Sequence, residues 1–171
     1  MKIRFIINPI SGTGKQKYIE KKIKNNLQFT YDIFYTKKQG DATKLSYKAI
    51  KENIDVIVAV GGDGTVNECA KALIGSNVGI GVIPCGSGNG FANHIGMNST
   101  IAKAIIQLNT SKFSLIDSCS VNGETFVNVS GIGFDAHIAN LFGKDKKRGL
   151  SNYMKIIIKE LFYSPQFYTI E

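Results

Sequence analysis

The sequence predicts an α/β protein in which a Rossmann-like, doubly wound parallel sheet is followed by the start of a β-rich second domain. Short apolar runs alternate with segments of helical periodicity, which is typical of a parallel sheet covered by helices on both faces. The run Asp55–Val60 is unbroken and rich in β-branched residues, as expected of a strand buried on both faces. Near residue 113 the pattern changes to shorter strand-like segments.

The first 112 residues are expected to form the α/β domain. Its predicted strands are Lys2–Ile7, Tyr31–Thr36, Asp55–Val60 and Val78–Ile83. Helices are expected from about Tyr18 to Leu27, from Gly40-Asp41, from Thr65, after Gly90, and over Ile101–Leu108. Glycine-containing loops follow the first, third and fourth strands. In parallel sheets ligands bind beyond the carboxyl ends of the strands, so these loops are expected to converge on one site.

Residues 113–171 are expected to be the incomplete beginning of the second, β-rich domain. The predicted strands are Phe113–Ile116, Ser118–Val121 and Thr125–Val129, and Asn122-Gly123 is a hairpin turn signal. A helix over Ser151–Phe162 and an extended piece over Gln166–Ile170 follow. We expect the chain to stop before this domain closes a core. Its exposed strand edges would then favour a homodimer or association with a missing C-terminal half.

Composition limits the cellular setting and the partners. The net charge of +8 calls for an anionic partner, among which are anionic lipid headgroups, polyphosphates and nucleic acid. The basic run Lys15–Lys24 is also compatible with a solvated helix face, and it offers only Tyr18 for stacking on bases, which argues against nucleic acid. Three widely spaced cysteines without a zinc pattern indicate a reduced, cytoplasmic compartment. The longest apolar stretches are far short of the ~20 residues that a membrane span needs.

The segment Gly61-Gly62-Asp63-Gly64-Thr65 is the most informative loop. Its glycines let the backbone approach a ligand closely, and the helix expected from Thr65 would direct its free N–H groups at a phosphate. Thr65 and Glu68 fit a capping box at that helix start. A carboxylate at position 63 would repel phosphate unless Mg²⁺ lies between them or the carboxylate takes the proton of an attacking hydroxyl. The chemistry therefore points to phosphoryl transfer, although a tight turn in which Asp63 only caps the helix is the alternative.

Four segments carry a resemblance to a known family. The Gly-Gly-Asp-Gly-Thr loop resembles that of phosphofructokinases, NAD kinases and lipid kinases. The opening Asn8-Pro9-Ile10-Ser11-Gly12 resembles the Asn-Pro-x-Ser-Gly loop of the diacylglycerol kinase and sphingosine kinase superfamily. The segment from Pro84 to Asn93 resembles the family loop Gly-Thr-x-Asn-Asp-Phe-Ala-Arg, with Ser87 at the threonine, but Gly90 replaces the aspartate and Asn93 the arginine. Phe126–Ala136 resembles the family segment Phe-x-Asn-x-x-x-x-Gly-x-Asp-Ala.

The resemblance implies an ATP-dependent lipid kinase that acts with Mg²⁺ on a lipid hydroxyl, such as that of diacylglycerol or a sphingoid base, at an anionic membrane surface. Residues 1–112 would be the ATP-binding catalytic domain. Asp63 would be catalytic and hold Mg²⁺, and Asp135 would lie near the acceptor lipid. The implied nucleotide site comprises Asn8, Pro9, Ser11, Gly12, Lys15, Thr36, Gly61, Gly62, Asp63, Gly64, Thr65, Asn67, Glu68, Gly86, Ser87 and Asn89.

Two other functions remain open at this point. A kinase of a soluble substrate, similar to NAD kinase or phosphofructokinase, would share the Gly-Gly-Asp-Gly-Thr loop but not the Asn-Pro-x-Ser-Gly opening. A non-enzymatic nucleotide-binding remnant or regulatory module would fit a chain that lacks the second-domain acidic residues of bacterial lipid kinases. Turnover by this chain alone is therefore an open question.

Overall fold

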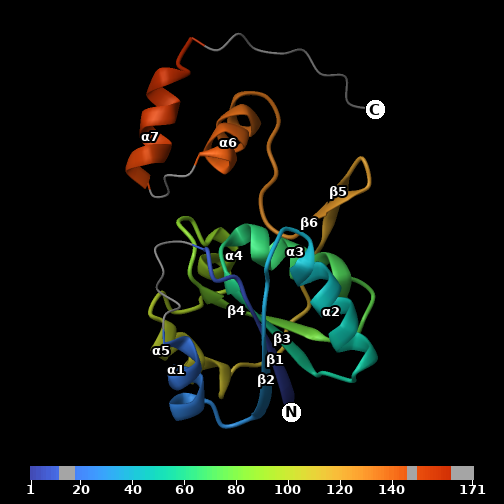
Figure 1. Cartoon of the computed structure of the whole chain (residues 1–171). Helices are drawn as coiled ribbons and strands as arrows, with labels where there is room; N and C mark the ends of the chain where they lie inside the picture. Colours follow the sequence, from blue (N-terminus) through green and yellow to red (C-terminus); the bar gives the residue numbers. More distant parts are fainter. Residues whose placement is uncertain (12–17, 146–149, 163–171) are drawn as a thin grey trace. The chain divides into compact units, whose positions relative to one another are not determined.

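The structure is a computed structural model that describes residues 1–11, 18–145 and 150–162. It divides into two compact units, Met1–Asn128 and Val129–Glu171. The first unit contains a four-stranded sheet in the order β2-β1-β3-β4 (Figure 1). Its strands are β1 (Lys2–Ile7), β2 (Thr30–Tyr35), β3 (Val56–Gly61) and β4 (Gly79–Pro84). All neighbouring pairs are parallel.

Helices cover both faces of this sheet, which confirms the doubly wound α/β fold. On one face α1 (Ile19–Asn26) and α5 (Ile101–Leu108) pack against Ile3, Phe5 and Ile7 of β1. On the other face α2 (Asp41–Lys51), α3 (Asp63–Leu73) and α4 (Gly90–His94) pack against side chains that include Ile6, Ile57 and Ala59. Every residue of β3 is buried, as its β-branched run predicts. The four predicted strands are confirmed to within one residue at each end.

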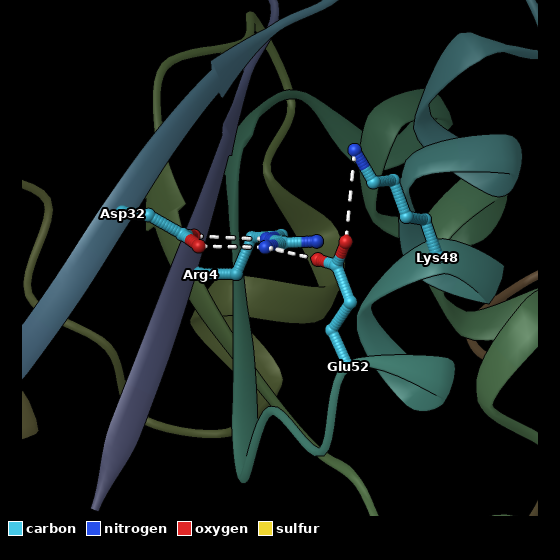
Figure 2. A network of polar contacts seen from close by, with 4 residues as sticks. All are labelled: Arg4, Asp32, Lys48 and Glu52. Carbon is cyan, nitrogen blue, oxygen red and sulfur yellow. Dashed lines mark hydrogen bonds and ion pairs between the residues drawn. The ribbon is translucent and has the colours of Figure 1, made fainter.

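A charged cluster fastens the edge strand β2 to the rest of the unit (Figure 2). Arg4 of β1 points to the face that α2 covers and is 2% exposed. Its Nε and Nη2 donate to the two carboxylate oxygens of Asp32 on β2, at 2.8 and 2.6 Å. Nη2 also lies 2.7 Å from Glu52, directly after α2, and Glu52 in turn pairs with Lys48 at 3.6 Å. One arginine thus connects two strands and a helix on a face that is otherwise apolar.

The hairpin predicted around Asn122-Gly123 is present. The antiparallel strands β5 (Cys119–Val121) and β6 (Glu124–Phe126) flank the turn, in which both residues have positive φ (51° and 78°). The amide of Asn67 on α3 donates to the Thr125 carbonyl at 3.1 Å. The ammonium group of Lys71, also on α3, pairs with Glu124. These contacts place the hairpin in the first compact unit.

The strand predicted over Phe113–Ile116 is absent, and that prediction is wrong. Three of the four residues are apolar, but no strand among the described residues pairs with them, and their side chains are exposed. The hairpin is the start of a second sheet. The assignment of residues 113–171 to a second domain stays a prediction, because the compact units divide after Asn128.

The described residues of the second unit form two helices, α6 (Phe134–Lys144) and α7 (Leu150–Lys159). His137 of α6 lies 2.9 Å from Glu160, just beyond α7. The helix predicted over Ser151–Phe162 is confirmed but ends at Lys159, and α6 was not predicted. The extended piece expected over 166–170 lies outside the described residues. Among the residues that the structure describes, none of the helices is long and apolar enough to cross a membrane.

Candidate phosphate-binding edge of the sheet

The residues that follow each strand of the parallel sheet lie side by side at one edge. The backbone ladder continues one step past the strand ends: Thr36 N–H donates to the Ile7 carbonyl at 2.9 Å, and Asn8 N–H donates to the Val60 carbonyl at 3.0 Å. Cys85 N–H likewise donates to the Gly61 carbonyl at 2.9 Å. The loops after all four strands therefore start from fixed and adjacent positions, as expected for ligand-binding loops of a parallel sheet.

The helix after β3 begins two residues earlier than predicted. Its first residue is Asp63 and its N-cap is Gly62, which makes no side-chain capping bond. Thr65 lies inside the first turn and is buried at 6% exposure. Its Oγ1 accepts a hydrogen bond from Asn8 Nδ2 at 3.2 Å, so the loop after β1 is tied to α3. The predicted Thr65–Glu68 capping box is therefore wrong.

Glu68 instead caps the neighbouring helix α2. Its Oε2 accepts the backbone N–H groups of Gly40 at 3.0 Å and Ala42 at 3.2 Å, where α2 begins. The Glu68 carbonyl also accepts from Thr43 Oγ1 at 2.8 Å. An anionic carboxylate at a helix N-terminus is favourable because the first N–H groups of a helix have no intrahelical acceptors. The loop between Thr36 and α2 is thereby fixed to α3.

The Asp41 carboxylate also holds the loop between Thr36 and α2. Asp41 Oδ2 accepts the backbone N–H groups of Lys37 at 2.9 Å and Lys38 at 3.1 Å. The bond from Lys37, followed by that from Lys38, lowers the pKa of Asp41 below its usual value. Asp41 therefore stays ionised near neutral pH. The loop that begins at Thr36 is held by Asp41 at Lys37 and Lys38, and by Glu68 at Gly40 and Ala42. Thr36 itself is 8% exposed.

The loops after β3 and β4 touch backbone to backbone. A Cβ added to Gly86 would lie 2.5 Å from the Cα of Gly62, which leaves no room for a side chain at position 86. Asn89, in the left-handed region with φ 57°, holds this loop in shape. Its Oδ1 accepts from Gly86 N–H at 2.8 Å, and its Nδ2 donates to the Gly86 carbonyl at 2.9 Å. Both ends of the Asn89 amide are thus engaged within the loop.

Asp63 faces the loop that leads into α4. Its Oδ1 accepts the backbone N–H of Phe91 at 3.0 Å. A Cβ at Gly88 would lie 3.3 Å from Asp63 Oδ2, and one at Gly90 would lie 3.7 Å from Oδ1. The carboxylate therefore has one oxygen in a hydrogen bond and glycines on both sides. Asp63 does cap a helix, as the alternative for this loop held, but the helix is α4 rather than its own.

Other predicted site residues differ in how accessible they are. Pro9, Gly64 and Ser87 are exposed, and the Ser87 hydroxyl has no hydrogen-bond partner among the described residues. The Asn67 amide donates to the hairpin. Gly12 and Lys15 lie outside the described residues. Asp135, in the first turn of α6, belongs to the second unit and is exposed. All of these assignments to the nucleotide or acceptor site stay predictions.

The donor set around Asp63 suits a magnesium ion that arrives with its nucleotide. The described residues hold no group of three or more His, Cys, Asp and Glu side chains that could bind a metal by themselves. Mg²⁺ in kinases is often held by one or two carboxylates together with substrate phosphates and water. Asp63, with Oδ2 beside the Gly88 backbone, meets that requirement.

Cys69 on α3 is unsuited to nucleophilic chemistry, because burial raises the pKa of its thiol to about 12.

One neighbour of this edge was not singled out from the sequence. A Cβ added at Gly90 would lie only 2.6 Å from the side-chain Nδ2 of Asn128, the last residue of the first unit. The available signal is the Phe-x-Asn pattern at Phe126–Asn128, which does not by itself indicate a contact with the loop after β4. That connection spans 38 positions, and only the fold reveals it.

Fixed turns, glycines in close contact and a helix N-terminus at the carboxyl edge of a parallel sheet are features that this α/β domain shares with phosphate-binding domains. The model of the diacylglycerol kinase catalytic domain family matches residues 2–121. The chain therefore belongs to this family of lipid kinases.

Individual relatives agree with this placement. The diacylglycerol kinase of Bacillus subtilis (strain 168) is 35% identical over 136 residues, which cover 76% of this chain and 45% of that protein. A Klebsiella pneumoniae (strain 342) protein named "Probable lipid kinase YegS-like" is 33% identical over 125 residues, 71% of this chain and 42% of its own length. A crystal structure of a diacylglycerol kinase from Bacillus anthracis has 30% identity and a TM-score of 0.65, over 73% of this chain and 47% of that one. The chain thus spans about half the length of the relatives it matches.

Proposed function

We propose that this chain is the ATP-binding part of a lipid kinase, which transfers the γ-phosphate of ATP to a lipid hydroxyl. One observation supports this most directly: the loops after all four parallel strands are fastened to α3 or to one another at the sheet edge, in a chain that belongs to a lipid kinase family. Preformed loops suit a polyphosphate because binding then costs little ordering of the backbone. The acceptor would be diacylglycerol, a sphingoid base or a related lipid.

In this proposal the backbone N–H groups and exposed hydroxyls bind the phosphates, and several side chains act only by holding loops. Asn8–Gly12, Gly61–Thr65 and Ser87 would cradle ATP, and Lys15 would offset phosphate charge. Asn67, Glu68 and Asn89 would act through the elements that they fasten, since their side chains already bind the hairpin, the start of α2 and the loop after β4. A magnesium ion carried by the nucleotide would neutralise the developing charge on the β,γ-phosphates.

Asp63 would serve the reacting end of the nucleotide, as a magnesium ligand or as the acceptor of the lipid hydroxyl proton. In the transfer, the lipid oxygen forms a bond to the γ-phosphorus, the bond to the β,γ-bridging oxygen breaks, and ADP leaves. The hydroxyl proton passes to a carboxylate, for which Asp63 is the candidate. Asp135 would lie on the acceptor side. The net charge of +8 suits an anionic membrane surface, where the protein would bind peripherally, and nucleic acid is not the expected partner.

The first test is magnesium-dependent nucleotide binding by isothermal titration calorimetry. Wild-type protein is expected to bind ATP in Mg²⁺ buffer and to lose most of that affinity in EDTA. Asp63→Asn keeps an oxygen for the Phe91 N–H bond but removes the charge, so it should keep the fold and lose the magnesium dependence. Wild-type protein without any magnesium-dependent ATP affinity would refute the proposal.

The second test follows the label of [γ-³²P]ATP into candidate acceptors. Diacylglycerol and sphingosine in anionic vesicles should accept label, whereas NAD and fructose 6-phosphate should not. Label in a soluble acceptor would favour the kinase of a soluble substrate. Because the chain spans about half of its relatives, the assay is run with and without the remaining half of a relative. ATP binding without transfer in both arms would favour a non-enzymatic nucleotide-binding module. Sedimentation at several concentrations then tests for a homodimer.

A further inference from the structure

The contact between the end of the hairpin and the loop after β4 brings a second polar side chain to Asp63. Gly90 separates the two: its missing Cβ would lie 2.6 Å from Asn128 Nδ2 and 3.7 Å from Asp63 Oδ1. The Asn128 amide nitrogen therefore occupies the place that a side chain at position 90 would take, next to the Asp63 carboxylate. Gly90 is also the position at which this loop departs from the Asn-Asp pattern of the resembling kinases.

The Asn128 carboxamide is available to a ligand. The residue is exposed, and among the residues that the structure describes no hydrogen bond occupies its amide. This distinguishes it from Asn67 and Asn89, whose amides hold the hairpin and the loop after β4. Its position is fixed, because Asn67 binds the Thr125 carbonyl and Lys71 pairs with Glu124 in the strand that ends two residues earlier. A free amide on a fastened segment is suited to hydrogen bonding a bound group.

The groups around the Asn128 amide favour an anionic oxygen as its hydrogen-bond acceptor. The amide nitrogen faces Gly90, and an N–H donor needs an acceptor. The Asp63 carboxylate lies close by but already accepts from Phe91, and the proposed function puts the transferred phosphate next to this carboxylate. A phosphoryl oxygen is an anionic acceptor, and hydrogen bonds to charged acceptors are the stronger ones. A side chain at position 90 would displace the Asn128 amide from this place.

We propose that Asn128, whose amide lies against Gly90 and beside Asp63, donates a hydrogen bond to an oxygen of the terminal phosphate of ATP. This inference rests on the proposed function and adds a γ-phosphate contact to it. ADP lacks that phosphate, so Asn128 contributes to the preference for ATP over ADP. The contact belongs to the first unit alone.

The test compares ATP and ADP affinities by isothermal titration calorimetry in Mg²⁺ buffer. Wild-type protein should bind ATP more tightly than ADP. Asn128→Ala should weaken ATP binding about tenfold, the typical worth of one charge-assisted hydrogen bond, and leave ADP within about twofold. Asn128→Asp should weaken ATP further, because it places a second carboxylate beside the phosphate. Asn77→Ala is the matched control: an exposed asparagine before β4, at the opposite edge of the sheet, which should change neither affinity.

A double-mutant cycle separates this contact from a merely structural role. The Cβ of Gly90→Ala would displace the Asn128 amide, so this variant should lose ATP affinity as Asn128→Ala does, and the double variant should lose no more than either single one. Gly143→Ala, where a Cβ meets nothing within 4 Å, is the glycine control.

Each remaining outcome contradicts the inference. Equal losses of ATP and ADP affinity, unchanged ATP affinity in Asn128→Ala, or additive losses in the double variant would overturn it while the proposed function stands. Tighter ATP binding by Asn128→Asp would indicate a metal ligand at this position and would also overturn it. Absence of magnesium-dependent ATP binding by the wild type refutes the proposed function itself, and the inference with it.

Discussion

Glu68 provides the sharpest test, because the structure and the sequence resemblance assign different roles to its side chain. The family resemblance implies a nucleotide contact, whereas in the structure Oε2 accepts two backbone N–H groups at the start of α2. Glu68→Gln keeps the size of the side chain and a carbonyl oxygen that can accept both N–H groups, but it removes the negative charge. Glu68→Ala removes the acceptor altogether. If Glu68 caps α2, both variants should lose stability. If Glu68 contacts the nucleotide, both should lose ATP affinity.

The expected size of the effect follows from the two bonds. A hydrogen bond to a charged group contributes about 1.5–3 kcal/mol and a neutral one about 0.5–1.5 kcal/mol. Glu68→Gln should therefore lower the free energy of unfolding by about 2 kcal/mol, with about 1 kcal/mol from each N–H. Glu68→Ala should cost about 3 kcal/mol, because Gly40 is half-buried and Ala42 is buried, so water satisfies their N–H groups only in part. Against a total stability of about 5–15 kcal/mol, either loss is measurable.

Urea unfolding followed by circular dichroism measures the stability, and calorimetry measures ATP affinity on the same samples. We expect Glu68→Gln to shift the urea midpoint and to change the ATP dissociation constant by less than about threefold. Glu124→Gln is the control, because that carboxylate pairs with α3 from an exposed position and should shift the midpoint little. A Glu68→Gln protein as stable as wild type, with much weaker ATP binding, would refute the capping role.

Three further outcomes follow from the fold. Asp32→Ala should destabilise the protein by about 3 kcal/mol in urea unfolding, because it removes a bidentate partner from the buried Arg4; a loss below about 1 kcal/mol would contradict this. The hydrogen bond from Arg4 lowers the pKa of Glu52 below its usual 4.5, so its contribution is present above that pH and is lost as pH falls through the folded-state pKa. Unfolding midpoints of wild type and Glu52→Gln should therefore differ at pH 7 and converge once the pH falls below the folded-state pKa of Glu52. Gly86→Ala should weaken ATP binding and lower thermal stability, because its Cβ would lie 2.5 Å from the Gly62 backbone; unchanged values would mean that the two loops separate easily.

The strands were predictable because burial on both faces leaves a direct mark on composition. Val56–Val60 sits between two strands and under helices on both sides, and its β-branched run could form little else. The run Phe113–Ile116 is also largely apolar but forms no strand, since a strand exists only where another strand pairs with it. An apolar run alone reports which side chains could face a core, not whether a partner strand is there.

The site was predictable in its loops and not in its connections. Glycines, strand ends and the Gly-Gly-Asp-Gly-Thr string located the edge of the sheet. The start of α3 was placed two residues late, because Asp63 and Gly64 are weak helix formers that the hydrogen bonds of the first turn nonetheless include. The partner of Glu68 lies 28 positions away at Gly40, so a local capping box was the only pairing that the sequence offered.

The first turns of α3 work as a common anchor, and this explains why so many polar residues there bind protein rather than ligand. Asp63 holds the loop before α4, Thr65 holds the loop after β1, and Glu68 holds the loop before α2. Each uses a side chain, so in the proposed function the first backbone N–H groups of the helix remain for a phosphate. Substitutions at these positions would therefore shift a neighbouring loop first and alter ligand contacts only as a result. This indirect loss of ligand affinity should be smaller for Thr65→Ser, which keeps the hydroxyl that accepts from Asn8, than for Thr65→Val, which removes it.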